Sequence, residues 1–294
     1  MTEVRSYYGR AVLKEPVWKR EIPWYFFAGG SAGAAATLAL AARIAGNEEP
    51  RIAASRVDAA GVLVSPLLLV ADLGRPERFL NMLRVFKVTS PMSVGSWTLL
   101  ASGAASSTVL ACDVLGILPR RRLLGTVVAG ALGPFLSTYT AALVSDTAIP
   151  VWHEARRELP LVFAGSSAAS GGALTAMFTP AGSGAPARRL AVGGALVELA
   201  ATHRMEQRLG FLGEPYRTGK SGLYARLARG LTAAGAVVTA AAGRRRSRML
   251  LGGALLCAGS ACGRLAVFNA GFQSARDPKY TILQQRKEIE RRAV

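Results

Sequence analysis

The sequence has few residues of the kinds that hold metals or form disulfides. Its 294 residues include only two histidines and three cysteines, and no two cysteines form a CxxC pair. Iron–sulfur clusters and attached haem need closely spaced cysteines, and a transmembrane b-type haem needs two histidines at one depth. Because His153 is predicted in a loop and His203 at a helix end, we expect no haem, no iron–sulfur cluster and no metal site in this chain.

Charge is scarce as well, and it is gathered into short clusters. Only 18% of the residues are charged, whereas 51% are hydrophobic. The longest runs without charge are 22–42, 88–112, 123–145 and 159–187. Each run is at least as long as the ~20 apolar residues that cross a bilayer core of ~30 Å. These runs predict a multi-pass membrane protein rather than a soluble domain.

The formal net charge is +18, which in a soluble protein would suggest binding to nucleic acid. Here the basic clusters, such as 120–122 and 244–246, lie between apolar runs, where they set topology and meet anionic lipid headgroups. We therefore expect membrane lipids as partners and no nucleic acid. Basic residues are more numerous on the side of the N-terminus, which predicts that both termini are cytoplasmic and that the chain lies in the cell membrane.

The pattern predicts an all-α integral membrane protein with eight transmembrane helices. The expected spans are 22–43, 56–72, 91–114, 123–145, 158–179, 187–203, 222–243 and 249–271. Three of them, the second, sixth and seventh, are less certain because ionisable residues lie within them or near their starts. The other five rest on apolar length, although Arg264 interrupts the eighth.

A short echo links two of the expected helix starts. Glu-Ile-Pro at 21–23 precedes Phe-Ala-Gly-Gly-Ser-Ala at 27–32, and Glu-Leu-Pro at 158–160 precedes Phe-Ala-Gly-Ser-Ser-Ala at 163–168, with one gap. A true repeat would imply two four-helix halves that enter the membrane from the same face. In a chain rich in alanine and glycine, a chance match is an equal alternative.

Ionisable residues at membrane depth are costly, and they are therefore candidates for function. Glu198 is the deepest carboxylate by sequence, and proton transfer and a structural hydrogen bond are equal alternatives for it. Asp146 and His203 are further candidates for proton transfer. No nucleophile–base motif is visible, so we do not expect this chain to catalyse a reaction alone.

Aromatic residues follow Glu21 at the start of the first span, at 24–27. An aromatic belt at the headgroup level explains them, and so does the wall of a pocket for a quinone headgroup. Quinone reduction takes up two protons with two electrons, so such a pocket needs hydrogen-bond donors and an acid. A tyrosine hydroxyl remains a donor at neutral pH. Tyr139 fits this role, about two turns before Asp146.

Several segments together resemble the NrfD/polysulfide reductase family of membrane subunits. They are EIPWYFF at 21–27, DLGRPERF at 72–79, SPMSVGSW at 90–97, YTAALVS at 139–145, and the stretch from Glu198 through His203 to Tyr216. The resemblance implies two four-helix bundles, at 22–145 and 146–271. An N-terminal interfacial segment (1–21) would precede them, and a charged C-terminal tail (272–294) would follow.

The same resemblance implies a function and a set of partners. The subunit would exchange electrons and protons with menaquinone or ubiquinone near the face that carries the N-terminus. Its partners would be a four-cluster, ferredoxin-like iron–sulfur subunit and a molybdopterin-type catalytic subunit. The final substrate of that catalytic subunit is not specified by this chain.

The residues expected at the quinone pocket are Tyr139, Glu21, Trp24 and Tyr25. Some relatives have a histidine there that this sequence lacks, and Glu21 is the expected substitute as proton donor. The residues expected at the pocket edge or in contact with a partner are Asp72, Arg75 and His153. For Asp72 and Arg75 a structural ion pair is an equal alternative.

Two other functions remain as alternatives. A membrane anchor or proton-conducting module of such a complex would not bind quinone and would be insensitive to inhibitors of quinone sites. A small-solute transporter would have inverted repeats and helices broken at mid-membrane, whereas the echo between 21–32 and 158–168 has parallel sense.

Overall fold

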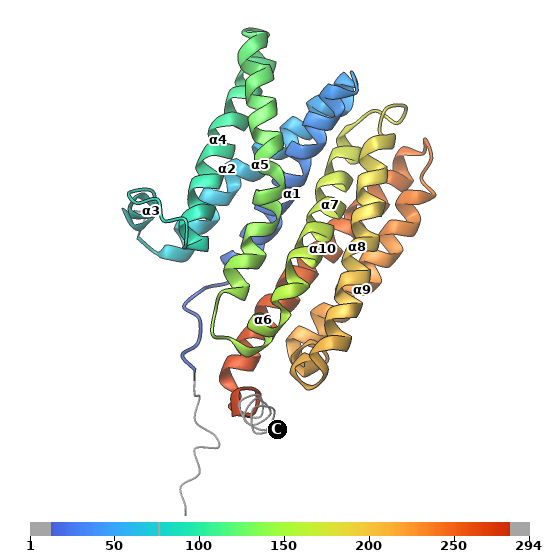
Figure 1. The fold of residues 1–294 in the computed structure, drawn as a ribbon. Helices are drawn as coiled ribbons and strands as arrows, with labels where there is room; N and C mark the ends of the chain where they lie inside the picture. Colours follow the sequence, from blue (N-terminus) through green and yellow to red (C-terminus); the bar gives the residue numbers. More distant parts are fainter. Residues whose placement is uncertain (1–12, 76, 283–294) are drawn as a thin grey trace, which may run out of the picture.

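The computed structural model describes residues 13–75 and 77–282. Within these ranges eight helices have 20 or more residues: α1 (Glu21–Ile44), α2 (Glu48–Leu73), α4 (Pro91–Leu115), α5 (Pro119–Ser145), α7 (Leu159–Phe178), α8 (Ala185–Leu209), α9 (Gly219–Ala240) and α10 (Arg246–Arg276). Four short helical segments lie in the connections: α3 (Glu77–Met82), α6 (Pro150–Glu154), η1 (Ala155–Arg157) and η2 (Gly210–Tyr216). The long helices run side by side (Figure 1).

Six of the eight long helices in the described ranges are long and apolar enough to cross a membrane. They are α1, α2, α4, α5, α7 and α10. The other two, α8 and α9, carry more polar sequences, with Glu198 and Glu206 in α8 and Arg226 and Arg229 in α9. The all-helical prediction is confirmed, and six of the eight predicted spans are supported. That α8 and α9 also cross the membrane remains a prediction.

The start of α2 differs most from its predicted span. The helix begins at Glu48, whereas the sequence predicts a start at residue 56. Arg51 explains the difference, because its guanidinium is buried in ion pairs with Asp113 of α4 (Nη2–Oδ1 2.9 Å) and Glu48 (Nε–Oε2 2.8 Å). Paired in this way, an arginine can lie inside a helix bundle. The pairing joins positions far apart in the sequence, and a search for apolar runs does not detect it.

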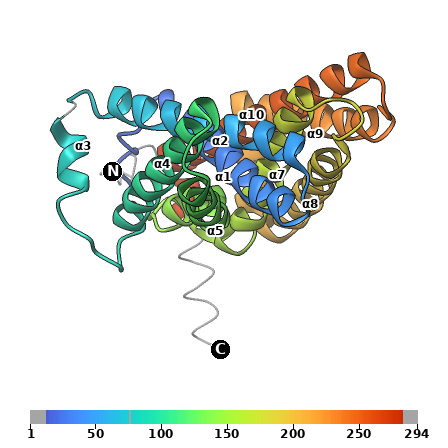
Figure 2. The ribbon, with the colours of Figure 1, turned by 90° about the horizontal axis from the view of Figure 1, so that it is seen from above.

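The long helices form two groups of neighbours. Helices α1, α2, α4 and α5 pack together, and so do α7, α8, α9 and α10 (Figure 2). Helices α1 and α7 join the groups: α1 contacts α7 and α10, while α7 also contacts α2 and α5. The two central helices therefore hold the molecule together.

The two helices whose starts carry the echo, α1 and α7, pack against each other. The ring of Phe26 in α1 lies 5.9 Å from that of Phe163 in α7, and the hydroxyls of Ser31 and Ser170 are hydrogen-bonded at 2.7 Å. Residue numbers rise together along both helices, so α1 and α7 are parallel. The facing pairs are 137 and 139 positions apart, whereas the echo aligns residues 136 or 137 positions apart, so a repeat and a chance match stay equal alternatives. The parallel sense weighs against the inverted repeat of a transporter.

Small residues allow α1 to approach α5. A Cβ atom at Gly33 would lie 2.7 Å from the Ser137 hydroxyl and 3.0 Å from the Cβ of Leu136, and it would also overlap the carbonyl oxygen of Gly133. The Ser137 hydroxyl donates a hydrogen bond to the Gly30 carbonyl at 3.2 Å. Lipid provides no hydrophobic drive between helices, so close packing and such bonds must hold them together.

We expect Gly33→Ala to destabilise the chain by ~1–3 kcal/mol, because the added methyl group overlaps α5. Gly103→Ala is the matched control, since a Cβ at position 103 in α4 meets no atom within 4 Å. The control should be neutral or stabilising by up to ~1 kcal/mol. Unfolding in detergent, followed by circular dichroism, measures both variants. Equal stabilities would contradict the packing argument.

Candidate functional site

A cavity of about 150 Å³ lies at the N-terminal end of α1, among α1, α2, α4 and α5. The chain before α1 and the short helix α3 close its mouth. Most of the wall is apolar or aromatic, and Asp72, Ser96 and Tyr139 bring polar groups to it. The lining residues are Val17, Trp18, Ile22, Tyr25, Phe26, Leu69, Asp72, Leu73, Met82, Met92, Ser96, Tyr139 and Leu143.

Two tyrosines meet in this cavity. The rings of Tyr139 in α5 and Tyr25 in α1 are edge to face, with centroids 6.4 Å apart. Tyr25 is only 3% exposed, whereas Tyr139 is half-buried. The hydroxyl of Tyr139 has no hydrogen-bond partner among the described residues. Tyr139 is therefore free to donate a hydrogen bond to a molecule in the cavity.

Gly95 of α4 makes room for Tyr139. A Cβ atom at position 95 would overlap the edge of the Tyr139 ring and lie 3.0 Å from its Cζ. Met92 and Ser96 on the same helix line the cavity. These three residues belong to the SPMSVGSW segment, which marks the family resemblance in the sequence but was not predicted to form the pocket. That segment was the signal that could have located this wall.

Two carboxylates lie at the mouth of the cavity. Asp72, at the end of α2, accepts a hydrogen bond from the backbone N–H of Lys19 at 2.7 Å. Glu21 is within electrostatic reach of Asp72, and its buried Oε2 has no partner among the described residues. Arg75 is exposed in the connection from α2 to α3 and does not line the cavity. The structure thus places one expected edge residue in the wall and the other on the surface beyond it.

Trp24 points away from the cavity, contrary to expectation. It is 48% exposed and is absent from the cavity wall, whereas its neighbour Tyr25 is buried there. Successive helical residues point about 100° apart, and here the cavity lies on the side of α1 that carries Ile22, Tyr25 and Phe26. The exposure of Trp24 fits an aromatic belt at the membrane interface.

The second half of the chain holds a buried pair of opposite charges. Glu198 in α8 is 5% exposed, and its Oε2 has no partner among the described residues. Arg264 in α10 acts on it electrostatically and is 1% exposed. The Nη2 of Arg264 donates to the Phe163 carbonyl at 3.0 Å and to the Ser167 hydroxyl at 2.9 Å, and the guanidinium lies 3.8 Å from the centroid of the Phe163 ring.

Polar groups continue from Glu198 along α8. A small cavity of about 30 Å³ is lined by Glu198, Glu206 and Arg229 among others, and Arg229 pairs with Glu206 at 2.8 Å. The hydroxyl of Tyr216, another lining residue, is buried without a partner among the described residues. Glu198 was predicted from the sequence, whereas Glu206 and Arg229 were not. Glu206 lies in the six residues by which α8 extends beyond its predicted end, and Arg229 enters the site through its ion pair with Glu206.

The remaining candidates lie at exposed helix ends. Asp146 follows α5, and His153 lies in α6. His203 in α8 is hydrogen-bonded to Gln207 at 2.9 Å. All three are exposed, and none lines either cavity. The structure does not bring them together with Tyr139 or Glu198.

The family of the chain follows from comparison with known proteins. Residues 14–185 match the family described as polysulphide reductase, NrfD. The chain belongs to the NrfD family. No curated protein matches it. Family membership and six apolar helices make this NrfD-family chain a multi-pass membrane protein. The match includes Tyr25, Asp72 and Tyr139, whereas Glu198 and Arg264 lie beyond it.

An ion pair joins the end of α8 to the start of α7. Arg208, in the last turn of α8, donates from Nε and Nη2 to the two carboxylate oxygens of Glu158, both at 2.6 Å, and also bonds the Glu154 carbonyl. The Arg208 guanidinium lowers the pKa of Glu158 below its ordinary value. Because Glu158 directly precedes α7, the pair ties the start of α7 to the end of α8.

This pair should make stability depend on pH. A carboxylate with a lowered pKa stabilises the fold above its unfolded pKa of ~4.3, and that contribution is lost as the pH falls through the lower folded pKa. We expect Glu158→Gln to lower stability by ~1–3 kcal/mol at neutral pH and to reduce the loss of stability in acid. Thermal unfolding between about pH 3 and pH 7 measures both effects.

Glu77→Gln is the control, because Glu77 in α3 is exposed and has no ion pair among the described residues. It should leave the pH profile of the wild type unchanged. If Glu158→Gln also leaves that profile unchanged, the ion pair contributes nothing to stability.

Proposed function

We propose that this chain is the quinone-reactive membrane subunit of an iron–sulfur/molybdopterin-type oxidoreductase complex. It exchanges electrons and protons with menaquinone or ubiquinone at the Tyr139 cavity. The observation that carries this proposal is the unpartnered hydroxyl of Tyr139 in a mostly apolar and aromatic cavity. Membrane subunits of the NrfD family generally partner with iron–sulfur and molybdopterin catalytic subunits, which supports the same assignment.

The cavity suits a quinone headgroup in shape and chemistry. Binding sites for small apolar molecules combine apolar walls with a few polar groups that fix orientation. Here the edge-to-face rings of Tyr25 and Tyr139 border the space, and the Tyr139 hydroxyl donates to a quinone carbonyl oxygen. Reduction to the quinol adds two electrons and two protons. Asp72 and Glu21, at the mouth, relay those protons between the cavity and water.

The partner subunits dock on the face that carries the start of α1. The cavity opens toward this face, so a docked iron–sulfur subunit brings its nearest cluster close to the quinone. Arg75 in the connection from α2 to α3 and His153 in α6 are exposed and are available to contact the partner. In this arrangement all eight long helices cross the cell membrane as two four-helix bundles, and both termini are cytoplasmic.

Proton transfer in the second bundle centres on Glu198. This carboxylate lies beside Arg264, and the cavity below it continues through Glu206 and Arg229. Such a row of ionisable groups within a helix bundle is typical of proton relays. Asp146 and His203 are exposed and exchange protons with water on the face that carries the start of α1.

Tyr139→Phe tests the quinone site, because it removes one hydroxyl and keeps the ring. We expect quinone-linked turnover to fall by about 10²-fold, the usual effect of losing an acid–base group, while the complex stays assembled. Tyr224→Phe is the matched control, since Tyr224 lies in α9 outside the cavity. Turnover is measured on the purified complex with a soluble quinone analogue.

Unchanged turnover in Tyr139→Phe would count against this tyrosine as the donor. Absence of co-purified quinone, together with insensitivity to inhibitors of quinone sites, would instead favour a membrane anchor or a proton-conducting module.

A further inference from the structure

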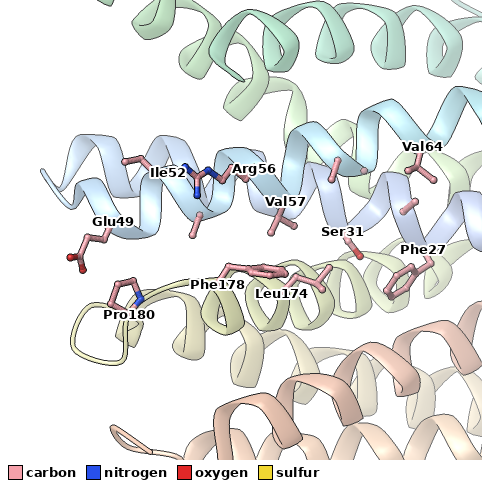
Figure 3. A pocket seen from close by; sticks show the side chains of 14 residues that line it. Phe27, Ser31, Glu49, Ile52, Arg56, Val57, Val64, Leu174, Phe178 and Pro180 are labelled. Carbon is pink, nitrogen blue, oxygen red and sulfur yellow. The ribbon is translucent and has the colours of Figure 1, made fainter. Parts of the chain in front are cut away.

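A second, larger cavity lies on a different face of α1 and α2. It is a groove of about 810 Å³ between α2 and α7, with α1 along its floor (Figure 3). The Tyr139 cavity uses Ile22, Tyr25 and Phe26 of α1, whereas the groove uses Phe27 and Ser31. The groove therefore runs between the two groups of helices and is separate from the proposed quinone site.

One end of the groove is closed by the connection from α7 to α8. Pro180 lines this end, and the Ser183 hydroxyl is hydrogen-bonded to the carboxylate of Glu49 in the first turn of α2. At this end of the groove the carboxylate of Glu49 therefore already accepts a hydrogen bond from the connection. Toward the other end, Figure 3 shows Phe27 and Val64 on facing helices.

Among the described residues that line this groove, Arg56 is the only cation. It is exposed and has no ion-pair partner among the described residues. It lies eight residues after Glu48, about 12 Å along α2 at ~1.5 Å per residue. If α2, at ~39 Å, is centred on a hydrocarbon core of ~30 Å, it extends only ~5 Å beyond the core at each end, and Arg56 then lies inside the core. An unpaired guanidinium there is costly unless it meets an anion.

The groove beyond Arg56 is apolar. Val57, Val64, Leu174 and Phe178 form its walls, and Figure 3 shows Val57 and Val64 on one side and Leu174 and Phe178 on the other. From Arg56 to Val64 the distance along α2 is again ~12 Å. A molecule that fits has an anionic head that reaches Arg56 and an apolar chain that follows the groove.

We infer that this groove binds one membrane phospholipid, with its phosphate on Arg56 and an acyl chain between α2 and α7. Charge decides the occupant: a phosphate neutralises the guanidinium, whereas a quinone offers it no charge. The long side chain of Arg56 can extend toward the headgroup level to meet the phosphate. Bound there, the lipid touches α2 on one side and α7 on the other, and it fills the seam between the two groups of helices.

Arg56→Gln tests the headgroup contact. The full chain is purified in detergent, stripped of loose lipid and examined by native mass spectrometry, which reports the mass of each bound molecule. We expect one phospholipid on the wild type and at least about tenfold weaker retention in Arg56→Gln, as for a lost charge-assisted hydrogen bond. Arg120→Gln, an exposed arginine at the start of α5 outside the groove, should retain lipid as the wild type does.

Ala60→Trp tests the acyl-chain contact by filling the groove. Ala60 is exposed and lines it, so the substitution should block lipid binding, whereas Ala101→Trp on the exposed face of α4 should not. Added short-chain phospholipid should restore the bound species in stripped wild type, and inorganic phosphate should not. Equal retention in Arg56→Gln and Arg120→Gln, or a bound mass equal to that of quinone, would overturn the inference.

Discussion

The parallel contact between α1 and α7 is the interaction on which the rest of the structure depends. The hydrogen bond between Ser31 and Ser170 and the close approach of Gly171 to the Ser31 carbonyl bring the two helices together. Within lipid, this kind of contact replaces the hydrophobic effect that drives soluble packing. With α1 and α7 in contact, α2 and α5 also pack against α7, and α10 packs against α1. Helix α1 presents one face to the Tyr139 cavity and another to the groove between α2 and α7.

The two groups of helices share a framework but differ in chemistry. Tyr25 of α1 and Val162 of α7 hold corresponding positions, and each lines a cavity in its own half. Around Tyr25 the wall is aromatic and apolar, which suits a flat ring. Around Val162 the wall contains the carboxylates of Glu198 and Glu206, which can bind and release protons. These two positions thus line an aromatic, apolar cavity in one group of helices and a charged cavity in the other.

Sequence alone predicted what depends on local composition and missed what depends on contacts across the fold. The charge-free runs located α1, α4, α5 and α7 closely, because membrane thickness sets their length. The sequence also located α10, whose apolar run Arg264 interrupts, although the helix extends beyond the predicted span at both ends. The start of α2 was missed because Arg51 is neutralised by Asp113, 62 positions away. The family resemblance predicted that Tyr139 and Tyr25 share one pocket. The direction in which Trp24 points could be known only once the orientation of α1 was known. Gly95 was missed because it has no side chain that would suggest a role.

Two buried arginines show why the second half suits proton transfer. Arg51 meets carboxylates on both sides, so its charge is neutralised in place. Arg264 meets a carbonyl, a hydroxyl and an aromatic ring, and no carboxylate of the described chain lies at ion-pair distance. Its compensation must come from Glu198 at longer range, and only when Glu198 is ionised. The ionisation of Glu198 therefore decides whether the charge of Arg264 beside the α1–α7 contact is compensated.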